Sequence, residues 1–241
     1  QKDKKEVLLT NLVDKSKKVK IPHNKYPVEK KKEFLYTVDK TARAYSDEIV
    51  QVSAGIIETD KDFVIANSNG NFVKSNYVLT RLVTTIYAER DGEKQSEFTD
   101  IGRSLGYEIL DLFDVEKRIT KLAKTAVEKL DAQDFKGGEL PVILAPGFGA
   151  VIFHEACGHG LEATSVAPHL SVFSDDLDKK VATDKVTLID DGTIKDAWGS
   201  SIVDDEGNPT HKNILIEKGI LKKYLVDQNH EKQMNMKSIR I

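Results

Sequence analysis

The residues whose types and spacing could do chemistry lie together in the run FHEACGHGLE, residues 153–162. A histidine–glutamate pair, His154 and Glu155, is followed by a second histidine, His159, five positions after the first. Neutral imidazoles are the commonest protein ligands of zinc, and a neighbouring carboxylate can take a proton from the water that attacks a peptide carbonyl. The run is therefore typical of metal-assisted peptide hydrolysis. The alternative interpretation is an apolar helix that carries a buried, hydrogen-bonded histidine.

The spacing of the two histidines constrains the helix that carries them. In the familiar His-Glu-x-x-His pattern the two imidazoles are four residues apart and share one helix face. A separation of five places His154 and His159 about 140° apart on a regular helix. Both can reach one ion only if the helix bulges or ends between them, and Gly158 and Gly160 are suited to such a break.

Two further residues of the run have open roles. Cys157, the only cysteine of the chain, is either a small buried hydrophobic residue or a substitute ligand three positions after His154. We expect the structural role. Glu162 follows His159 by three positions and could orient its imidazole, as metal-binding histidines usually require, or it is an ordinary surface glutamate.

The residues before this run predict a helix packed on an antiparallel meander. A helix begins after Pro27, and residues 50–56 then alternate between apolar and more polar side chains. Asn69-Gly70 and Asp91-Gly92 are strong hairpin turns on either side of a long strand over residues 77–88. A second helix begins at Asp114, a suitable N-cap, and its apolar face consists of Val115, Ile119, Leu122, Ala126 and Leu130.

The residues around the run predict the element that carries it. A short buried strand is expected over residues 140–145, followed by an apolar helix from about Ala150. Later strands are expected near residues 186–189 and in a hairpin that turns at Lys218-Gly219. The fold class is α+β, with helices packed on largely antiparallel sheet and the metal-binding helix directly after the buried strand.

We expect three regions along the chain: a basic segment (1–26), an N-terminal α/β meander domain (27–137) and the start of a catalytic domain (138–241). The boundary between the last two is placed at Gly137-Gly138. Residues 1–32 hold eleven lysines and four acidic residues, although the whole chain of 241 residues has a net charge of −3. No aromatic or arginine lies among the first lysines, so we expect a solvated segment and no direct nucleic-acid partner.

Composition narrows the cellular setting. No apolar run approaches the roughly 18 residues that a membrane span needs, and the N-terminal residues have no signal-peptide core. One cysteine in 241 residues excludes an internal disulfide framework and is typical of a reducing compartment. We expect a cytoplasmic protein without membrane contact.

Several motifs in order resemble the TldD/PmbA metallopeptidase family, in particular its metal-bearing, TldD-like branch. The closest match is the run HEACGHGLE, and the resemblance extends from about residue 27 to the end of the chain. The other branch of the family lacks the His-Glu-x-x-x-His signature. The further matching segments are KKVATD (179–184), IDDGTI (189–194), WGS (198–200), DDEG (204–207) and IANSNG (65–70).

The resemblance implies a zinc-dependent peptidase in which His154 and His159 bind Zn²⁺ and Glu155 serves as general base. It further implies a heterodimer with a metal-free, TldE/PmbA-like paralogue that cuts unfolded or leader-type peptides in an enclosed cleft. The family has also been labelled "modulator of DNA gyrase". We interpret that label as an indirect effect of proteolysis.

The chain departs from the family in one respect. The family's third metal ligand is a cysteine near the C-terminus of a chain about twice as long, whereas this sequence ends at Ile241 and its only cysteine is Cys157. We therefore expect a fragment or truncated product that lacks the C-terminal part of the family fold. The alternative function is a truncated, non-catalytic relative that binds peptides. A gyrase or DNA partner would rest only on the basic segment and on the family's old label.

Overall fold

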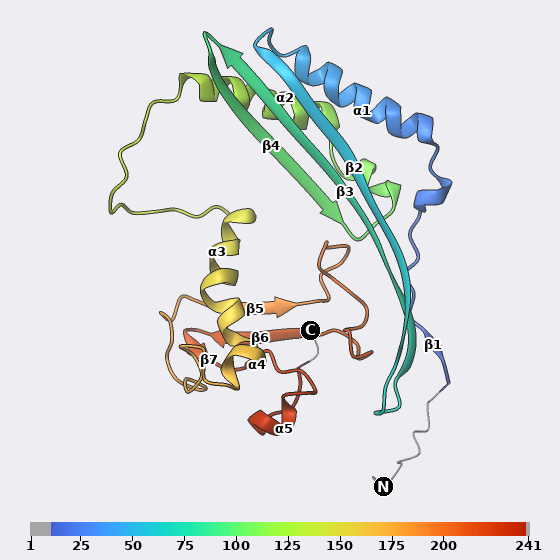
Figure 1. The fold of residues 1–241 in the computed structure, drawn as a ribbon, viewed down its shortest axis with the longest axis vertical. Coiled ribbons are helices and arrows are strands. Elements are labelled where there is room, and N and C mark those ends of the chain that lie inside the picture. Colours follow the sequence, from blue (N-terminus) through green and yellow to red (C-terminus); the bar gives the residue numbers. More distant parts are fainter. Residues whose placement is uncertain (1–10, 240–241) are drawn as a thin grey trace.

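A long, twisted antiparallel hairpin is the framework of the N-terminal half in the computed structural model, which describes residues 11–239 (Figure 1). Its strands β2 (Ile49–Ala66) and β3 (Phe72–Arg90) pair over almost their whole length. Strand β4 (Glu93–Arg103) pairs antiparallel with β3, and the two-residue strand β1 (Val13–Asp14) pairs parallel with it. At the predicted Asp91-Gly92 turn both residues have positive φ, 52° and 86°, which explains the residue types found there.

Two helices cover one face of this sheet, as the apolar periodicity predicts (Figure 1). They are α1 (Val28–Arg43) and α2 (Val115–Glu128), and the side chain of Asp114 accepts the backbone N–H of Lys117 at 2.9 Å as the N-cap of α2. Short 3₁₀ turns, His23–Lys25, Tyr107–Leu112 and Lys129–Asp131, flank the two helices. The buried core between helices and sheet consists of Val38, Ala42, Ile49, Ile86, Ala88, Ile119, Leu122, Ala123 and Ala126.

Residues 11–26 are attached to the sheet through Lys17 and the backbone, whereas Lys15, Lys18, Lys20 and Lys25 are exposed, as expected for a solvated segment. The ammonium of Lys17 donates to the backbone carbonyl of Ser104 and forms an ion pair with Asp196 at 2.8 Å. The backbone N–H groups of Lys20 and Ile21 each donate to the buried carboxylate of Glu108 at 2.9 Å. Lys17 therefore departs from the expectation of a solvated lysine, because it has specific partners in distant parts of the chain. Residues 1–10 of the expected basic segment lie outside the described residues.

The C-terminal half contains a small antiparallel sheet and several short helices. Its strands β5 (Leu188–Asp191), β6 (Lys212–Glu217) and β7 (Ile220–Leu221) are arranged in that order, with the predicted turn at Lys218-Gly219. Helices α4 (Ala163–Val166) and α5 (Glu231–Met234) lie beside it. Its buried core consists of Leu161, Ala163, Val166, Leu215, Ile216, Leu221, Tyr224 and Val226. Within residues 11–239 no helix is long and apolar enough to cross a membrane.

The buried strand expected over residues 140–145 is not formed. These residues have no regular secondary structure and are exposed, with Ile143 98% and Val142 76% accessible, and they pair with no strand of the described chain. An apolar sequence forms a strand only where a neighbouring strand satisfies its backbone groups, and none lies beside this one. The mixed α and antiparallel β content agrees with the expected α+β class, whereas the domain boundary at Gly137-Gly138 stays a prediction.

The tip of the β2–β3 hairpin reaches the C-terminal half. The side-chain amide nitrogens of Asn67 and Asn71 both donate to the carbonyl of Glu206, at 2.8 and 3.0 Å. Asn69 donates to the side chain of Gln228 at 2.6 Å. The two halves therefore contact each other directly, in addition to being joined by residues 132–147 (Figure 1).

Candidate metal centre and adjoining cleft

The helix that carries the candidate ligands changes its pitch within a few residues. A 3₁₀ turn (Phe148–Ala150) leads into α3 (Val151–Phe153), which continues as a π-helical turn (His154–Gly158) and a second 3₁₀ turn (His159–Leu161). The backbone N–H of His159 bonds to the carbonyl of His154, five residues earlier. A π turn of this kind is the bulge that the five-residue spacing requires, because it brings residues i and i+5 to the same side of the helix.

The bulge gathers three candidate groups at the surface of the C-terminal half. Ligand atoms of His154, Glu155 and His159 all lie within 4.8 Å of one another, and the ring centroids of the two imidazoles are 4.4 Å apart. Glu155 Oε2 lies 3.8 Å from His159 Nε2. All three residues are exposed, so an ion from solvent could reach them. The donor set of two imidazoles and a carboxylate suits zinc, and it identifies a candidate metal centre.

The two residues with open roles lie differently with respect to this centre. Glu162 Oε1 is 2.8 Å from His159 Nδ1, so the carboxylate contacts the imidazole on the side away from Glu155. Cys157 is half-buried, and its thiol does not join the three-residue group. Among the described residues no fourth histidine, cysteine or carboxylate completes that group. The geometry therefore favours the structural interpretation of Cys157.

A cleft of about 670 Å³ adjoins the candidate centre. One wall is the mixed helix, through Phe153, His154, Gly158 and Glu162, and the other is the unbroken segment 185–190, which leads into β5. Strand β5 lies at the edge of its sheet, so its outer backbone groups have no partner strand among residues 11–239. Sequence reasoning missed this wall because the edge position follows only from the strand order.

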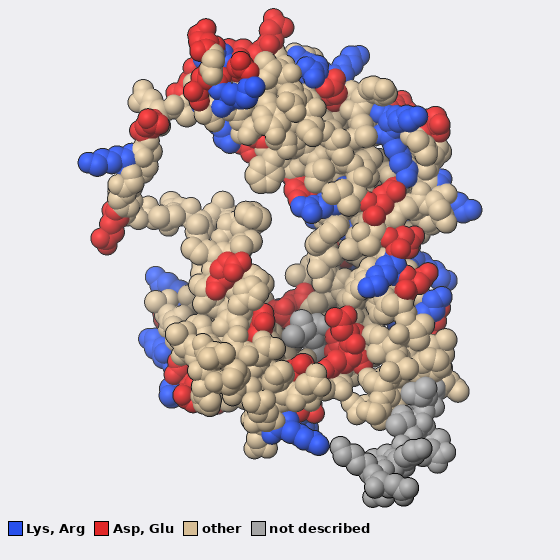
Figure 2. All heavy atoms as spheres, in the orientation of Figure 1, with Lys and Arg blue, Asp and Glu red and all other residues tan. Residues whose placement is uncertain are grey.

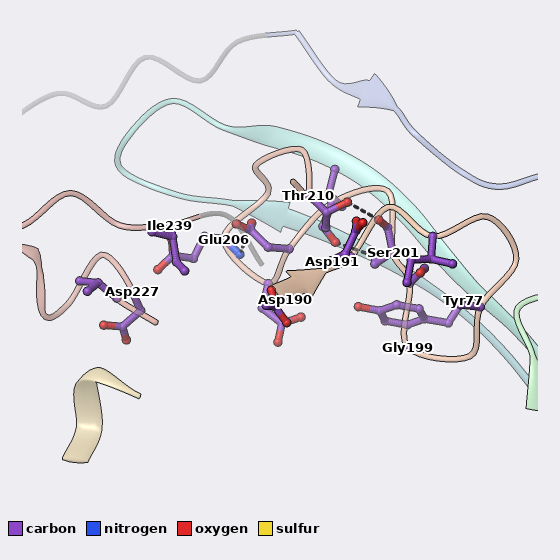
Figure 3. A pocket seen from close by; sticks show the side chains of 17 residues that line it. Tyr77, Asp190, Asp191, Gly199, Ser201, Glu206, Thr210, Asp227 and Ile239 are labelled. Carbon is purple, nitrogen blue, oxygen red and sulfur yellow. Dashed lines mark hydrogen bonds between the residues drawn. The ribbon is translucent and has the colours of Figure 1, made fainter. Parts of the chain in front are cut away.

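A second cavity, of about 740 Å³, lies between the C-terminal loops and Tyr77 of β3 (Figure 3). Carboxylates gather around the hollow in the space-filling view (Figure 2). Asp191 accepts two bonds from Thr193, and Asp204 accepts the backbone N–H groups of Glu206 and Asn208, so both aspartates stabilise turns. The acidic residues that line the cavity are Asp190, Asp191, Asp204, Asp205, Glu206 and Asp227.

Asp190 lies in β5 and borders both the cleft and the second cavity. Its Oδ2 atom is buried and has no hydrogen-bond partner among residues 11–239. Burial raises the pKa of this carboxyl, a hydrogen bond from Asn213 opposes the shift, and the charge of Asp191 adds to it. The wall between the two spaces therefore contains a carboxyl group that is more readily protonated than its neighbours.

Trp198 packs between the two halves of the chain. Its ring lies against Gly102 of β4 so closely that a Cβ on that glycine would come within 2.5 Å of the ring. The guanidinium of Arg81 lies 5.9 Å from the ring centroid. The indole is 40% accessible, and it joins the loop of the C-terminal half to the N-terminal sheet.

Comparison with known proteins identifies the family. Residues 21–133 match the model of the PmbA/TldA metallopeptidase central domain, and residues 137–239 match that of the PmbA/TldA metallopeptidase C-terminal domain. The chain belongs to the TldD/PmbA family. The resemblance noted from the sequence is thereby confirmed.

Curated relatives of this TldD/PmbA chain carry the TldD name. It is 34% identical to a metalloprotease TldD homolog of Buchnera aphidicola over 225 residues, which are 90% of this chain and 46% of the relative. A Haemophilus influenzae homolog is 33% identical over 86% of this chain and 44% of its own length. A protein of Saccharolobus solfataricus named zinc metalloprotease TldD homolog is 34% identical over 61% of this chain and 33% of its own length. The chain thus spans about half the length of the first two relatives.

Solved structures share the fold of this TldD/PmbA chain. A protein of Bacteroides thetaiotaomicron described as a modulator of DNA gyrase superimposes with a TM-score of 0.77 at 18% identity, covering 93% of this chain and 52% of its own. TldE of Thermococcus kodakarensis gives a TM-score of 0.71 at 22% identity, covering 98% of this chain and 53% of its own. These likenesses establish the fold.

Proposed function

We propose that this chain provides the metal-binding part of a zinc-dependent peptidase, with His154 and His159 as ligands and Glu155 as general base. The observation that carries the proposal is the π turn, which places ligand atoms of all three residues within 4.8 Å of one another. Helical bulges of this kind are rare in proteins, and those that occur are often found at functional sites. A relative named zinc metalloprotease TldD homolog supports zinc as the metal.

The two imidazoles and the carboxylate have different proposed roles, metal binding and proton transfer. Zinc held by the two imidazoles would supply a Lewis acid for the scissile carbonyl and lower the pKa of the attacking water. Glu155 accepts the proton of that water and delivers it to the nitrogen of the leaving amine. Its carboxylate is well exposed and lies 3.8 Å from His159 Nε2, the nitrogen proposed to bind zinc. The carboxylate is therefore close enough to contact a water molecule and a peptide at the candidate centre.

An extended peptide is the substrate that suits the cleft. The open edge of β5 offers backbone donors and acceptors beside the candidate centre, and such an edge binds extended chains through main-chain hydrogen bonds. In a folded protein most backbone N–H and C=O groups are already paired, so few extended segments are available for such binding. Unfolded or leader-type peptides are therefore the proposed substrates.

The proposed setting is the cytoplasm, in a heterodimer with a metal-free, TldE/PmbA-like paralogue. The structural likeness to TldE supports a partner with a related fold. The exposed apolar segment that precedes the candidate centre supports an interface on this side of the chain. Its most exposed members are Val142, Ile143 and Phe148, at 76%, 98% and 85%. Apolar surface of this extent is typical of interfaces.

A non-catalytic peptide-binding relative is the second candidate function. It is favoured by the small ligand set, because catalytic zinc sites have three protein ligands and the described residues offer two imidazoles beside the proposed base. Metal analysis of the purified chain separates the two functions. About one zinc per chain, together with zinc-dependent cleavage of an unstructured peptide when the paralogue is present, supports the peptidase, whereas peptide binding without metal supports the alternative.

A further inference from the structure

We propose that Glu162 is a positioning residue that fixes the tautomer of His159. The imidazole of His159 then has its metal-binding tautomer before the ion arrives, whereas the imidazole of His154 does not. The inference rests on the proposed function, because it takes His159 to be a ligand. It assigns a specific task to a residue outside the group of three, and it distinguishes His159 from His154.

The contact between Glu162 and His159 determines which imidazole nitrogen is free. Glu162 Oε1 lies 2.8 Å from His159 Nδ1, and a carboxylate can only accept a hydrogen bond. The proton of the neutral imidazole therefore lies on Nδ1, and the lone pair lies on Nε2. Nε2 is the nitrogen that faces Glu155, at 3.8 Å from its Oε2, so the free lone pair points toward the candidate centre.

The backbone on both sides of Glu162 is held in place, which makes its side chain a suitable support. Leu161 and Ala163 are 0% and 3% accessible. The backbone N–H of Leu225 donates to the carbonyl of Leu161 at 2.8 Å, and the N–H of Ala163 donates to the carbonyl of Leu225 at 2.8 Å. Thr164 Oγ1 lies 3.4 Å from the second carboxylate oxygen. The carboxylate therefore projects from a fixed base toward His159.

His154 lacks such support. Within residues 11–239 its ring forms no hydrogen bond, although it lies beside the His159 ring and within 4.8 Å of the Glu155 carboxylate. Either nitrogen of this imidazole can therefore carry the proton before metal binds. His159 is prepared as a ligand in advance, whereas His154 selects its tautomer when the ion arrives.

Zinc affinity of site variants tests this inference. Partners of this kind typically contribute 10–100-fold to metal affinity, so we expect Glu162→Ala to weaken zinc binding by about that factor in competition with a chromophoric chelator. Glu162→Gln keeps an oxygen that accepts from Nδ1 and should lose less. Asp175→Asn is the matched control, because it removes a carboxylate 3.7 Å from His169, outside the candidate centre. It should leave the affinity unchanged.

The ring nitrogens provide a second measurement that does not need the metal. In ¹⁵N spectra of the metal-free chain, His159 should be the Nδ1–H tautomer in the parent and in Glu162→Gln, and a mixture in Glu162→Ala. Circular dichroism checks the fold. If the alanine variant does not fold, Glu162→Met replaces it, because methionine has a side chain of similar length without a carboxylate. An unchanged tautomer together with unchanged zinc affinity would overturn the inference. A parent chain that binds no zinc would instead refute the proposed function, while the tautomer measurement would still test the role of Glu162.

Discussion

His154 and His159 are five residues apart in sequence, yet their ring centroids are 4.4 Å apart, because the N–H of His159 bonds to the carbonyl of His154. On a regular helix the second imidazole would point well away from the first. The candidate centre therefore depends on one π turn, and any substitution that restores a regular helix there should separate the ligands.

Replacing the proposed base should separate chemistry from metal binding. In Glu155→Gln both imidazoles remain, so zinc content should stay close to that of the parent chain. Peptide cleavage, measured by mass spectrometry with the paralogue present, should fall by about 10²–10⁴-fold because the amide cannot accept the proton. Glu33→Gln, on the exposed face of α1, is the matched control. Cleavage at the parent rate in Glu155→Gln would show that another group is the base.

The thiol should contribute nothing to metal affinity. Because Cys157 lies outside the three-residue group, Cys157→Ser should leave the zinc dissociation constant unchanged, whereas His154→Ala should weaken binding by at least about tenfold. Chelator competition on the two variants measures both values. If the serine variant alone emptied the site, the thiol would have to be a ligand, and the two-imidazole interpretation would be wrong.

The contacts of residues 11–26 should contribute to the free energy of unfolding. Lys17 joins the end of β4 to the C-terminal half through Ser104 and Asp196, so Lys17→Ala should lower the free energy of unfolding by about 1–2 kcal/mol. Lys18 is exposed, and Lys18→Ala should have no measurable effect. Urea denaturation of both variants makes the comparison. Equal stability would mean that the segment is held by other contacts alone.

Glu108 should make the protein sensitive to acid. Burial of this carboxyl opposes ionisation, yet the N–H bonds from Lys20 and Ile21 and further backbone N–H groups lower its pKa. A lowered pKa stabilises the folded state above the unfolded value of about 4.3, and that stability is lost as the pH falls through the folded pKa. Glu108→Gln should cost about 2 kcal/mol at pH 7 and flatten the loss of stability below about pH 4. Glu116→Gln on the exposed face of α2 should preserve the parent pH profile.

A single tryptophan reports on the junction between the halves. A Cβ added at Gly102 would lie 2.5 Å from Trp198 Cε3, so Gly102→Ala should displace the indole and cost about 1–3 kcal/mol. Displacement into water should shift the fluorescence emission to longer wavelength. Nothing lies within 4 Å of a Cβ at Gly199, and Gly199→Ala should therefore leave the spectrum as it is. A spectrum unchanged in both variants would show that the ring does not rest on β4.

Local signals predicted most of the elements. The cap at Asp114, the Asp91-Gly92 turn and the apolar stripe of α1 each depend on neighbours within a few residues, so the pattern alone sufficed. The same holds for the need for a helical break between His154 and His159, which follows from helix geometry.

Long-range partners account for what the sequence did not reveal. The ion pair of Lys17 could not be predicted from the composition of its segment, because its partner Asp196 lies 179 residues away. Residues 140–145 have the composition of a buried strand, but composition cannot provide the neighbouring strand that they need. The wall of the cleft formed by residues 185–190 likewise depends on strand order, which no local pattern records.

The contact between the hairpin tip and the C-terminal half has a consequence for the timing of folding. Asn67 bonds to the carbonyl of Glu206, which is 139 residues later in the chain. At a synthesis rate of about 5–20 residues per second, Asn67 is added to the chain roughly 7–28 s before Glu206 is added. During that interval α1 and the β2–β3 hairpin can already pair, but the tip stays undocked. The contact between the halves can therefore form only after the loop that contains Glu206 has been synthesised, so it belongs to a late step of folding.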